Sequence, residues 1–269
     1  MTSIEWTRSD DGTAGKTWNP TTGCDRISPG CDHCYALTMA KRLKGMGQAK
    51  YQNDGDPRTS GPGFGITTHP ETLAEPLRWK KPCRVFVNSM SDLFHARVPV
   101  AFIADVWQTM QATPQHTFQI LTKRPERLAR VLDQVHAALG LTEPLPNVWL
   151  GTSIESGDYV RRADRLRLAP AAVRFISAEP LLGPLPSLDL TDIDWLIIGG
   201  ESGPGARPLE LDWARQLLAE TDTTGTAPFV KQLGSVWAKE NGASDGKGGK
   251  PADWPADLRV REYPQAVAR

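Results

Sequence analysis

The chain has 269 residues, and its 31 Lys and Arg residues balance 31 Asp and Glu residues, so the formal net charge is zero at pH 7. This balance argues against bulk, salt-dependent adhesion to nucleic acid, although a local basic groove is compatible with it. Hydrophobic residues make up 39% of the chain, which is enough for a core in one large α/β domain or two small ones.

The sequence shows neither a membrane-spanning segment nor a leader. No stretch approaches the roughly 18 consecutive apolar residues of a membrane helix. Residues 1–6 (MTSIEW) lack the basic and apolar regions of a signal peptide. We therefore expect a cytoplasmic protein without a membrane partner, and there clustered cysteines are more often metal-binding or catalytic than disulfide-bonded.

Three of the four cysteines lie in one loop, residues 24–34, after a short predicted strand at residues 17–19. Cys24, Cys31 and Cys34 are one too few for a closed structural zinc site and an odd number for disulfides. They suit an iron–sulfur cluster, because a cubane takes four ligands and three cysteines leave one iron open. Zinc with His33 or a distant residue as the fourth ligand is an alternative, as are three unligated thiols. Cys83 is expected to be a small buried hydrophobe.

From residue 84 onward, short apolar runs alternate with longer helical patterns. The runs lack period-two polarity and are rich in β-branched or aromatic residues, which is typical of strands buried on both faces. They cover residues 84–88, 117–121, 147–150, 173–177, 195–198 and 228–231. Helices are predicted at residues 100–111, 125–138, 158–168 and 211–220.

Repeated strand–helix units predict an α/β fold with a parallel sheet. About six to seven strands approach the eight of a closed barrel, so a partial or full (β/α) TIM-like barrel is favoured over an open doubly wound sheet. We expect one barrel domain over residues 1–241, with residues 53–65 as a long loop. Residues 242–269 begin with a glycine-rich segment and are expected to pack back on the barrel.

Polar residues follow every predicted strand, and the C-terminal strand ends carry the working face of a barrel. An alternative explanation is that polar residues in these loops only cap the helices that follow. Capping accounts less well for Glu179 and Glu201, which lie directly at strand ends beside Pro and Gly. Lys123 and Arg124 suit a carboxylate or a phosphate, or else open a helix as a solvated pair. The candidates are Asn88, Ser89, Ser91, Asp92, Lys123, Arg124, Thr152, Ser153, Glu155, Glu179, Glu201, Lys231 and Gln232.

The cysteine loop resembles that of the radical S-adenosylmethionine (radical SAM) enzymes. Their signature is Cys-x3-Cys-x2-Cys after the first barrel strand, with an aromatic residue before the last cysteine. The segment from Cys31 to Cys34 matches the second half, with His33 in the aromatic position. Six residues, not three, separate Cys24 from Cys31, so the first half departs from the signature.

A closer resemblance covers nearly the whole chain. The chain resembles a family of phage and prophage proteins with a three-cysteine motif, which is similar to radical SAM enzymes such as the spore photoproduct lyases. Members of that family are linked to hypermodification of phage DNA bases. The matching segments are residues 18–24 (WNPTTGC), 28–31 (SPGC), 34–36 (CYA), 88–94 (NSMSDLF), 121–125 (LTKRP), 177–181 (SAEPL), 199–203 (GGESG) and 258–262 (LRVRE).

The resemblance implies a set of site residues. Cys24, Cys31 and Cys34 would hold a [4Fe–4S] cluster whose open iron binds S-adenosylmethionine. Lys123, Arg124 and Glu201 would remain for the substrate. His33 and Tyr35 would contact S-adenosylmethionine near its adenine. At the end of the second strand, where radical SAM enzymes usually carry Gly-Gly-Glu-Pro, this chain has Asn88, Ser89, Ser91 and Asp92 as the implied contacts. The remaining implied contacts are Thr152, Ser153, Glu155 and Glu179.

The implied reaction is cleavage of S-adenosylmethionine by the reduced cluster, giving a 5′-deoxyadenosyl radical that abstracts hydrogen from a DNA base or nucleoside. A reductant such as flavodoxin or ferredoxin would be a partner. The alternatives are the same chemistry on a peptide or small molecule, and a non-catalytic binding module stapled by zinc or a cluster. The basic residues Arg78, Lys80 and Lys81 around Trp79 either flank a DNA groove or form a solvated turn.

Overall fold

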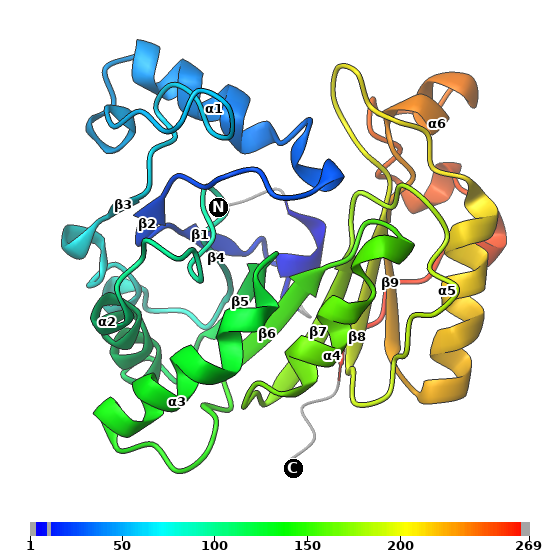
Figure 1. Cartoon of the computed structure of the whole chain (residues 1–269). Coiled ribbons are helices and arrows are strands. Elements are labelled where there is room, and N and C mark those ends of the chain that lie inside the picture. The colour runs from blue at the N-terminus through cyan, green and yellow to red at the C-terminus, as the bar shows by residue number, and fades with distance from the viewer. Residues whose placement is uncertain (1–3, 10–11, 265–269) are drawn as a thin grey trace.

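The computed structural model describes residues 4–9 and 12–264, and Figure 1 shows their arrangement. Two predictions fall partly outside the described residues. Residues 1–3 belong to the N-terminal segment for which no signal peptide is predicted, and residues 265–269 belong to the predicted C-terminal tail. No helix in the described parts of the chain is long and apolar enough to cross a bilayer.

Seven parallel strands form one sheet whose strand order follows the chain. A doubly wound sheet would reverse its strand order at a switch point, and this sheet does not. The first and last strands are not paired with each other, so the sheet is a curled half-barrel, which confirms the predicted partial barrel. The strands are β1 (Lys16–Trp18), β4 (Arg84–Val87), β5 (Thr117–Thr122), β6 (Val148–Ser153), β7 (Val173–Ala178), β8 (Trp195–Gly199) and β9 (Ala227–Gln232).

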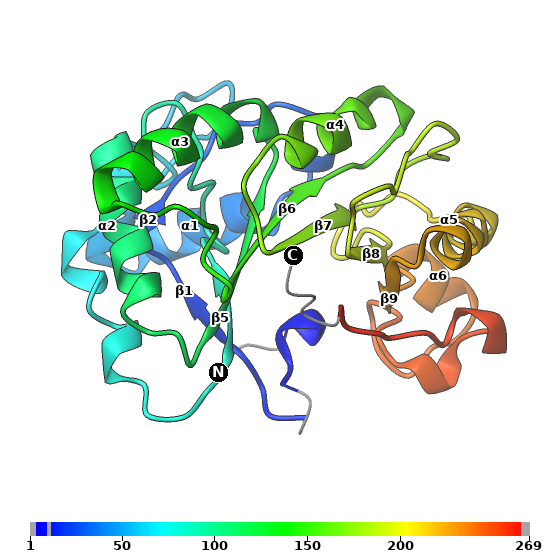
Figure 2. The same cartoon turned by 90° about the horizontal axis from the view of Figure 1, so that it is seen from below.

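Four of the helices lie where the sequence predicts them, on the convex side of the sheet (Figure 2). They are α2 (Val100–Gln111), α3 (Leu128–Leu139), α4 (Arg161–Arg167) and α5 (Leu211–Thr224). The predicted helices at 125–138 and 158–168 each begin with a 3₁₀ turn, which is common at helix N-termini.

Two helices and a small ribbon were not predicted. Helix α1 (Tyr35–Gly45) follows the last loop cysteine, and α6 (Ser235–Glu240) follows β9. Strands β2 (Thr21–Thr22) and β3 (Thr67–Thr68) form a two-stranded antiparallel ribbon beside the cysteine loop. Single 3₁₀ turns occupy Glu5–Thr7, Pro29–Cys31, Ala49–Tyr51, Pro70–Thr72, Pro76–Arg78, Pro125–Arg127, Gly157–Tyr159, Pro251–Asp253 and Ala256–Leu258.

The two faces of the sheet bury different side chains. Aliphatic residues such as Ile120 and Leu196 point outward and form the main core with the helices. On the concave side a smaller cluster of aromatic and β-branched residues fills the base of the half-barrel, and Trp6 of the N-terminal segment closes it. This cluster comprises Trp6, Phe86, Trp149, Val173, Phe175, Trp195, Ile197 and Phe229.

The same inward positions turn polar toward the C-terminal strand ends. On β6 the inward residues are Trp149, Gly151 and Ser153, because alternate residues of a strand share a face. Gly151 is required by packing, since a Cβ there would lie 2.4 Å from the ring of Phe175. An aromatic base and a polar rim therefore leave a hollow at one end of the sheet.

The segment after α6 lies against the last strand. The Val230 amide donates to Val260 (2.9 Å), and the Glu262 amide donates to Pro228 (2.8 Å). Trp254 is buried, and its indole N–H donates to the Gly248 carbonyl at 2.8 Å. These contacts cover the edge of β9, which would otherwise expose unpaired backbone groups.

Candidate cysteine-lined site

A cavity of about 580 Å³ opens at the C-terminal ends of the strands. Cys24, Cys31 and Cys34 all line it, and all three are free thiols. Its floor includes Trp6 and Phe86 from the aromatic base. The other walls come from the C-terminal ends of β4, β5, β6, β7 and β9 and from residues that directly follow β4, β5, β7 and β8, so the half-barrel brings distant parts of the chain to one space.

The cysteine loop is shaped by tight backbone turns. The Cys31 amide donates to Ser28 (2.9 Å), and the Cys34 amide donates to Cys31 (3.3 Å). Gly23 has a φ of +87° and lies so close to the Gly65 carbonyl that a Cβ would approach it to 2.2 Å. The loop is thus held in one conformation before any ligand is considered.

Burial governs the chemistry of two of the thiols. Burial, reinforced by the nearby Asp92 carboxylate, raises the pKa of Cys24 to about 12, against the opposing effect of Arg124. Burial also raises the pKa of Cys34. Because the thiolate is the metal-binding form, loading a metal here would release these protons and exchange them for metal–sulfur bonds.

Three cysteine thiols on one cavity wall are a donor set that an iron–sulfur cubane accepts. Among residues 4–9 and 12–264, no three His, Cys, Asp or Glu side chains gather tightly enough to hold one ion. A cubane binds each thiolate at a separate iron, so its ligands need not converge on one atom. The alternative zinc ligand, His33, directs its Nδ1 to Glu201 at 3.1 Å.

The first of three acid–arginine pairs holds the start of the loop. Arg124 Nη1 donates to Asp92 Oδ2 (3.0 Å) and to Cys24 Sγ (3.4 Å). Arg124 Nη2 donates to the Asp25 carbonyl at 3.0 Å. Both members were predicted as ligand contacts, yet in the structure they bind each other and the cysteine loop.

The second pair holds the middle of the loop. The Glu155 carboxylate is fully buried and accepts from Arg162 Nη1 at 2.8 Å. Its other oxygen accepts from the Gly30 amide at 3.3 Å. Glu155, predicted to contact ribose or a carboxylate, lies outside the cavity lining and contacts the cysteine loop.

The third pair also holds the middle of the loop, at Pro29. Arg207 Nη2 donates to Glu201 Oε1 (2.6 Å) and to the Pro29 carbonyl (2.9 Å). Burial opposes ionisation of Glu201, but hydrogen bonds from Arg207 and His33 outweigh it and lower the pKa of this carboxyl to about 2. Arg162 and Arg207 were not predicted, since nothing in the sequence marks an arginine as the partner of a strand-end acid.

The residues after β4 meet the loop from the opposite side. Asn88 is buried with φ of +62°, a left-handed conformation that Asn tolerates better than most residues. Its Oδ1 accepts from the Thr21 amide at 3.3 Å, whereas its Nδ2 is buried without a partner among the described residues. An unpaired buried donor is costly, so Asn88 Nδ2 marks a place where a ligand oxygen would be stabilised.

The hydroxyls near Asn88 are already engaged. Ser89 Oγ donates to Asn19 Oδ1 (3.2 Å), and Ser91 Oγ donates to the Thr21 carbonyl (2.8 Å). The hydroxyl of Tyr35 donates to the Ser89 carbonyl, while Tyr35 as a residue is 57% exposed. Tyr35 therefore presents an anchored aromatic ring at the cavity.

A further charged pair, between a glutamate and a lysine, faces the cavity from the end of β7 and from β9. Lys231 Nζ lies 2.9 Å from Glu179 Oε1, and Ser177 Oγ donates to Glu179 Oε2 at 3.1 Å. Gly199 makes room for this carboxylate, since a Cβ there would lie 2.4 Å from Glu179 Oε1. Gly200 packs as closely on the Leu233 carbonyl, so both glycines serve internal packing.

The structure brings most of the predicted site residues to one cavity. Thr152 and Glu155 are the exceptions, and the Thr152 hydroxyl donates to the Thr122 carbonyl at 2.9 Å. The predicted residues that line the cavity are Cys24, Cys31, His33, Cys34, Tyr35, Asn88, Ser89, Ser91, Asp92, Lys123, Arg124, Ser153, Glu179, Glu201, Lys231 and Gln232.

The basic turn before β4 does not belong to this cavity. Arg78, Lys80 and Lys81 precede the N-terminal end of β4, at the opposite end of the sheet. Trp79 packs edge-on against His116, and the Lys16 ammonium lies 5.0 Å from its ring centre. A stacking role for Trp79 at the cavity is therefore ruled out by its position.

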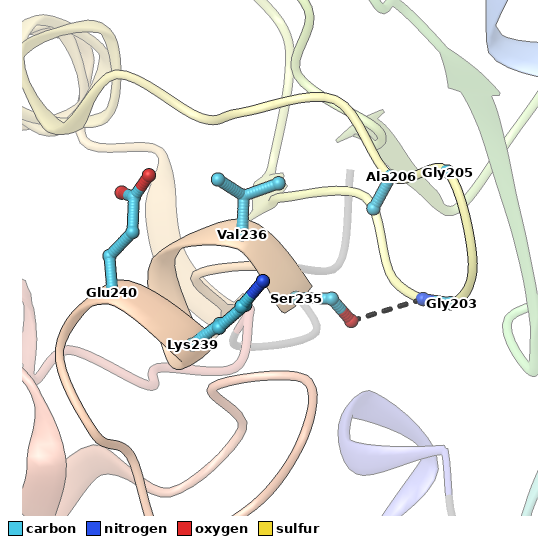
Figure 3. Close-up of a pocket in the computed structure, with 7 residues that line it drawn as sticks. All are labelled: Gly203, Gly205, Ala206, Ser235, Val236, Lys239 and Glu240. Atoms are coloured by element: carbon cyan, nitrogen blue, oxygen red, sulfur yellow. Dashed lines mark hydrogen bonds between the residues drawn. The ribbon is translucent and has the colours of Figure 1, made fainter.

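A more open hollow of about 440 Å³ lies between the loop after β8 and α6, and its lining is drawn in Figure 3. The Gly203 amide donates to Ser235 Oγ (3.0 Å), which in turn donates to the Gly246 carbonyl (2.7 Å). This hollow contains no cysteine, and these polar groups already have partners. The larger cavity is the one that gathers reactive groups.

Comparisons with known proteins add a family and a distant structural likeness. A family model described as "Protein of unknown function (DUF5131)" matches residues 1–260. No curated protein matches the sequence. Two solved structures of spore photoproduct lyase with dinucleoside spore photoproduct, one of a cysteine-to-alanine mutant, are 15% and 14% identical with TM-scores of 0.42 and 0.40. Each likeness covers 76% of this chain and 60% of that protein.

Proposed function

The chain belongs to the DUF5131 family, and we propose that it is a radical SAM enzyme. The observation that carries the proposal is the position of three free cysteines on one wall of a cavity, at the C-terminal ends of a parallel half-barrel. Three thiolates leave one iron of a cubane open to a second ligand, and the cavity provides space beside it.

Residues of this chain would divide the work as follows. Cys24, Cys31 and Cys34 would hold the cluster, and Asn88 Nδ2 would donate to an oxygen of S-adenosylmethionine. When bound, the cluster and S-adenosylmethionine supply the radical that abstracts hydrogen from the substrate. The aromatic floor around Trp6 excludes water from the closed end of the cavity.

We propose a nucleobase in DNA as the substrate. The exposed ring of Tyr35 at the cavity supports this, because aromatic side chains stack on bases regardless of sequence. Lys123 lines the same cavity and would attract phosphate. The pair of Glu179 and Lys231 offers an acceptor and a donor for a base edge. The reaction needs single electrons, which a flavodoxin or ferredoxin would supply.

Anaerobic reconstitution with iron and sulfide tests the enzyme class. We expect about four iron and four sulfide per chain, and release of 5′-deoxyadenosine when dithionite and S-adenosylmethionine are added. The matched control is Cys83→Ala, which alters the cysteine outside the loop and should retain both properties. A colourless protein that binds one zinc, or a loaded cluster that never yields 5′-deoxyadenosine, would refute the proposal.

The substrate is tested separately with oligonucleotides. Fluorescence anisotropy should show that single-stranded DNA binds and that Tyr35→Ala weakens it by roughly tenfold, because stacking contributes about 1–3 kcal/mol per base. Tyr35→Phe is the control, since it keeps the ring and loses only the hydroxyl. Equal DNA affinity in all three proteins would leave the enzyme class intact and remove the nucleobase proposal.

A further inference from the structure

One of the three acid–arginine pairs reaches a cysteine sulfur. Arg162 and Arg207 contact the loop through a glutamate partner or a backbone carbonyl. Arg124 instead directs Nη1 to Cys24 Sγ at 3.4 Å. A cation that donates to a cluster ligand does more than position the loop, because hydrogen bonds to the sulfurs are among the factors that set a cluster's reduction potential.

The Asp92 carboxylate fixes the direction in which Arg124 points. Asp92 Oδ1 accepts from the Thr122 hydroxyl (2.7 Å) and the Phe94 amide (3.0 Å). Asp92 Oδ2 accepts from the Lys123 amide (3.1 Å) and from Arg124 (3.0 Å). With four donors both oxygens of the carboxylate are fully hydrogen-bonded, and 13% of the Arg124 side chain is exposed. The guanidinium is therefore pre-organised toward the sulfur.

The three cysteines have unequal partners. Cys31 Sγ lies 3.8 Å from the neutral hydroxyl of Ser28. Cys34 is hydrogen-bonded by the backbone amides of Ala36 and Leu37, and the Lys123 ammonium acts on it through its charge, without a hydrogen bond. Among the hydrogen bonds of the described residues, the charged donor is directed at Cys24.

We propose that Arg124 is a positioning residue that raises the reduction potential of the cluster by donating a charged hydrogen bond to Cys24 Sγ. The inference rests on the proposed function, since it needs a cluster on the three cysteines. Reduction adds one electron to the cluster, and a cation fixed at a ligand sulfur stabilises the more negative state. Arg124, predicted as a substrate contact, is thereby assigned to the cluster instead.

The test is a redox titration of the reconstituted protein, with dithionite as the electron donor and the cluster's EPR signal as the readout. Arg124→Gln should shift the midpoint to a more negative potential. We expect at least a tenfold smaller equilibrium constant for reduction, which is about 59 mV for one electron. Arg127→Gln is the matched control, because Arg127 donates to the Phe94 carbonyl and contacts no cysteine.

A double variant separates the effect of Arg124 on the midpoint potential from the effect of an unpaired Asp92 carboxylate. Arg124→Gln alone leaves the Asp92 charge uncompensated, which also disfavours reduction. Asp92→Asn with Arg124→Gln keeps the net charge of the pair and removes the cationic donor, so its midpoint should still lie below that of the wild type. A wild-type midpoint in the double variant would overturn the inference.

The outcomes separate this inference from the proposed function. A wild-type protein that loads no cluster refutes both, whereas loaded variants with unchanged midpoints refute the role of Arg124 alone. If the variants fail to load, the wild-type protein labelled with ¹⁵N-arginine decides. Pulsed EPR of the reduced cluster should then show coupling to an arginine nitrogen, and its absence would contradict the proposal.

Discussion

Several side chains at this site hold the cysteine loop in place, in addition to any contact with a ligand. Asp92, Glu155 and Glu201 come from three strand ends, and each is paired with an arginine that contacts the loop directly or through its acid. Buried acids of this kind are stable only when paired and hydrogen-bonded. The sequence identified the acids from their position after strands. It could not identify Arg162 or Arg207, because the arginine that pairs with a buried acid depends on the tertiary structure, and no local sequence pattern marks it.

Asn88 provides a test of the predicted S-adenosylmethionine contact. Asn88→Gly removes the unpaired Nδ2 donor, together with the Oδ1 acceptor of the Thr21 amide, and retains a residue that accepts a positive φ without strain. We expect about tenfold weaker binding of S-adenosylmethionine, about 1.4 kcal/mol, because one hydrogen bond is lost. Isothermal titration of the reconstituted protein measures this. Unchanged affinity, with unchanged iron content, would exclude Asn88 as a ligand contact.

Glu201 makes the stability of the fold depend on pH. Its folded-state pKa of about 2 lies below the ordinary value of 4.5, so the ionised carboxylate stabilises the protein above about pH 5. That contribution is lost as the pH falls toward 2, and it amounts to at most about 3 kcal/mol. Urea unfolding should show Glu201→Gln to be less stable at pH 7 by up to this amount. A difference that stays constant down to pH 3 would argue against the ion pair.

At the scale of elements, the strands were easier to predict than the short helices. Strands β6 and β8 are buried at every position. The short apolar runs at their positions in the sequence are a strong indication of strands in a buried parallel sheet. Helix α1 buries only the small residues Ala36 and Ala40 fully and Leu37 and Leu43 in part, so its apolar face is narrow and gives a weak pattern in the sequence. Helix α6 has six residues, fewer than two turns, and is stabilised by its surroundings.

The packing of β6 against β7 predicts a specific defect. Gly151→Ala places a methyl group within 2.4 Å of the Phe175 ring, in the aromatic base of the half-barrel. We expect a loss of about 1–3 kcal/mol in unfolding free energy, which is typical of overpacking. Phe175→Leu in the same chain should restore part of the loss by vacating the ring volume. Two effects that simply add, as measured by urea unfolding, would contradict direct contact.

At the scale of the whole molecule, the open half-barrel explains why one cavity collects so many groups. The aromatic cluster closes the N-terminal end of the sheet, and the cysteine loop lies across the other end. The sequence predicted the rim, since parallel strands place all their C-terminal ends on one side. It could not predict that Trp6 forms the floor, because that contact joins residues distant in the chain.

Ligand binding should therefore stabilise the whole fold. With S-adenosylmethionine at 100 times its dissociation constant, the reconstituted protein should gain about 2.7 kcal/mol in unfolding free energy. Anaerobic thermal unfolding measures the gain. Cys31→Ala, which lacks one cluster ligand, should show little or none of it. An equal gain in both proteins would mean that S-adenosylmethionine binds independently of the cysteines.

The central claim is that three cysteines hold a cluster with one iron open to S-adenosylmethionine. EPR spectroscopy of the dithionite-reduced, reconstituted protein, recorded with and without S-adenosylmethionine, tests it most directly. We predict a reduced-cluster signal whose g values change when S-adenosylmethionine is added, because the cofactor binds the open iron. A cluster signal that is identical with and without saturating S-adenosylmethionine would contradict the claim.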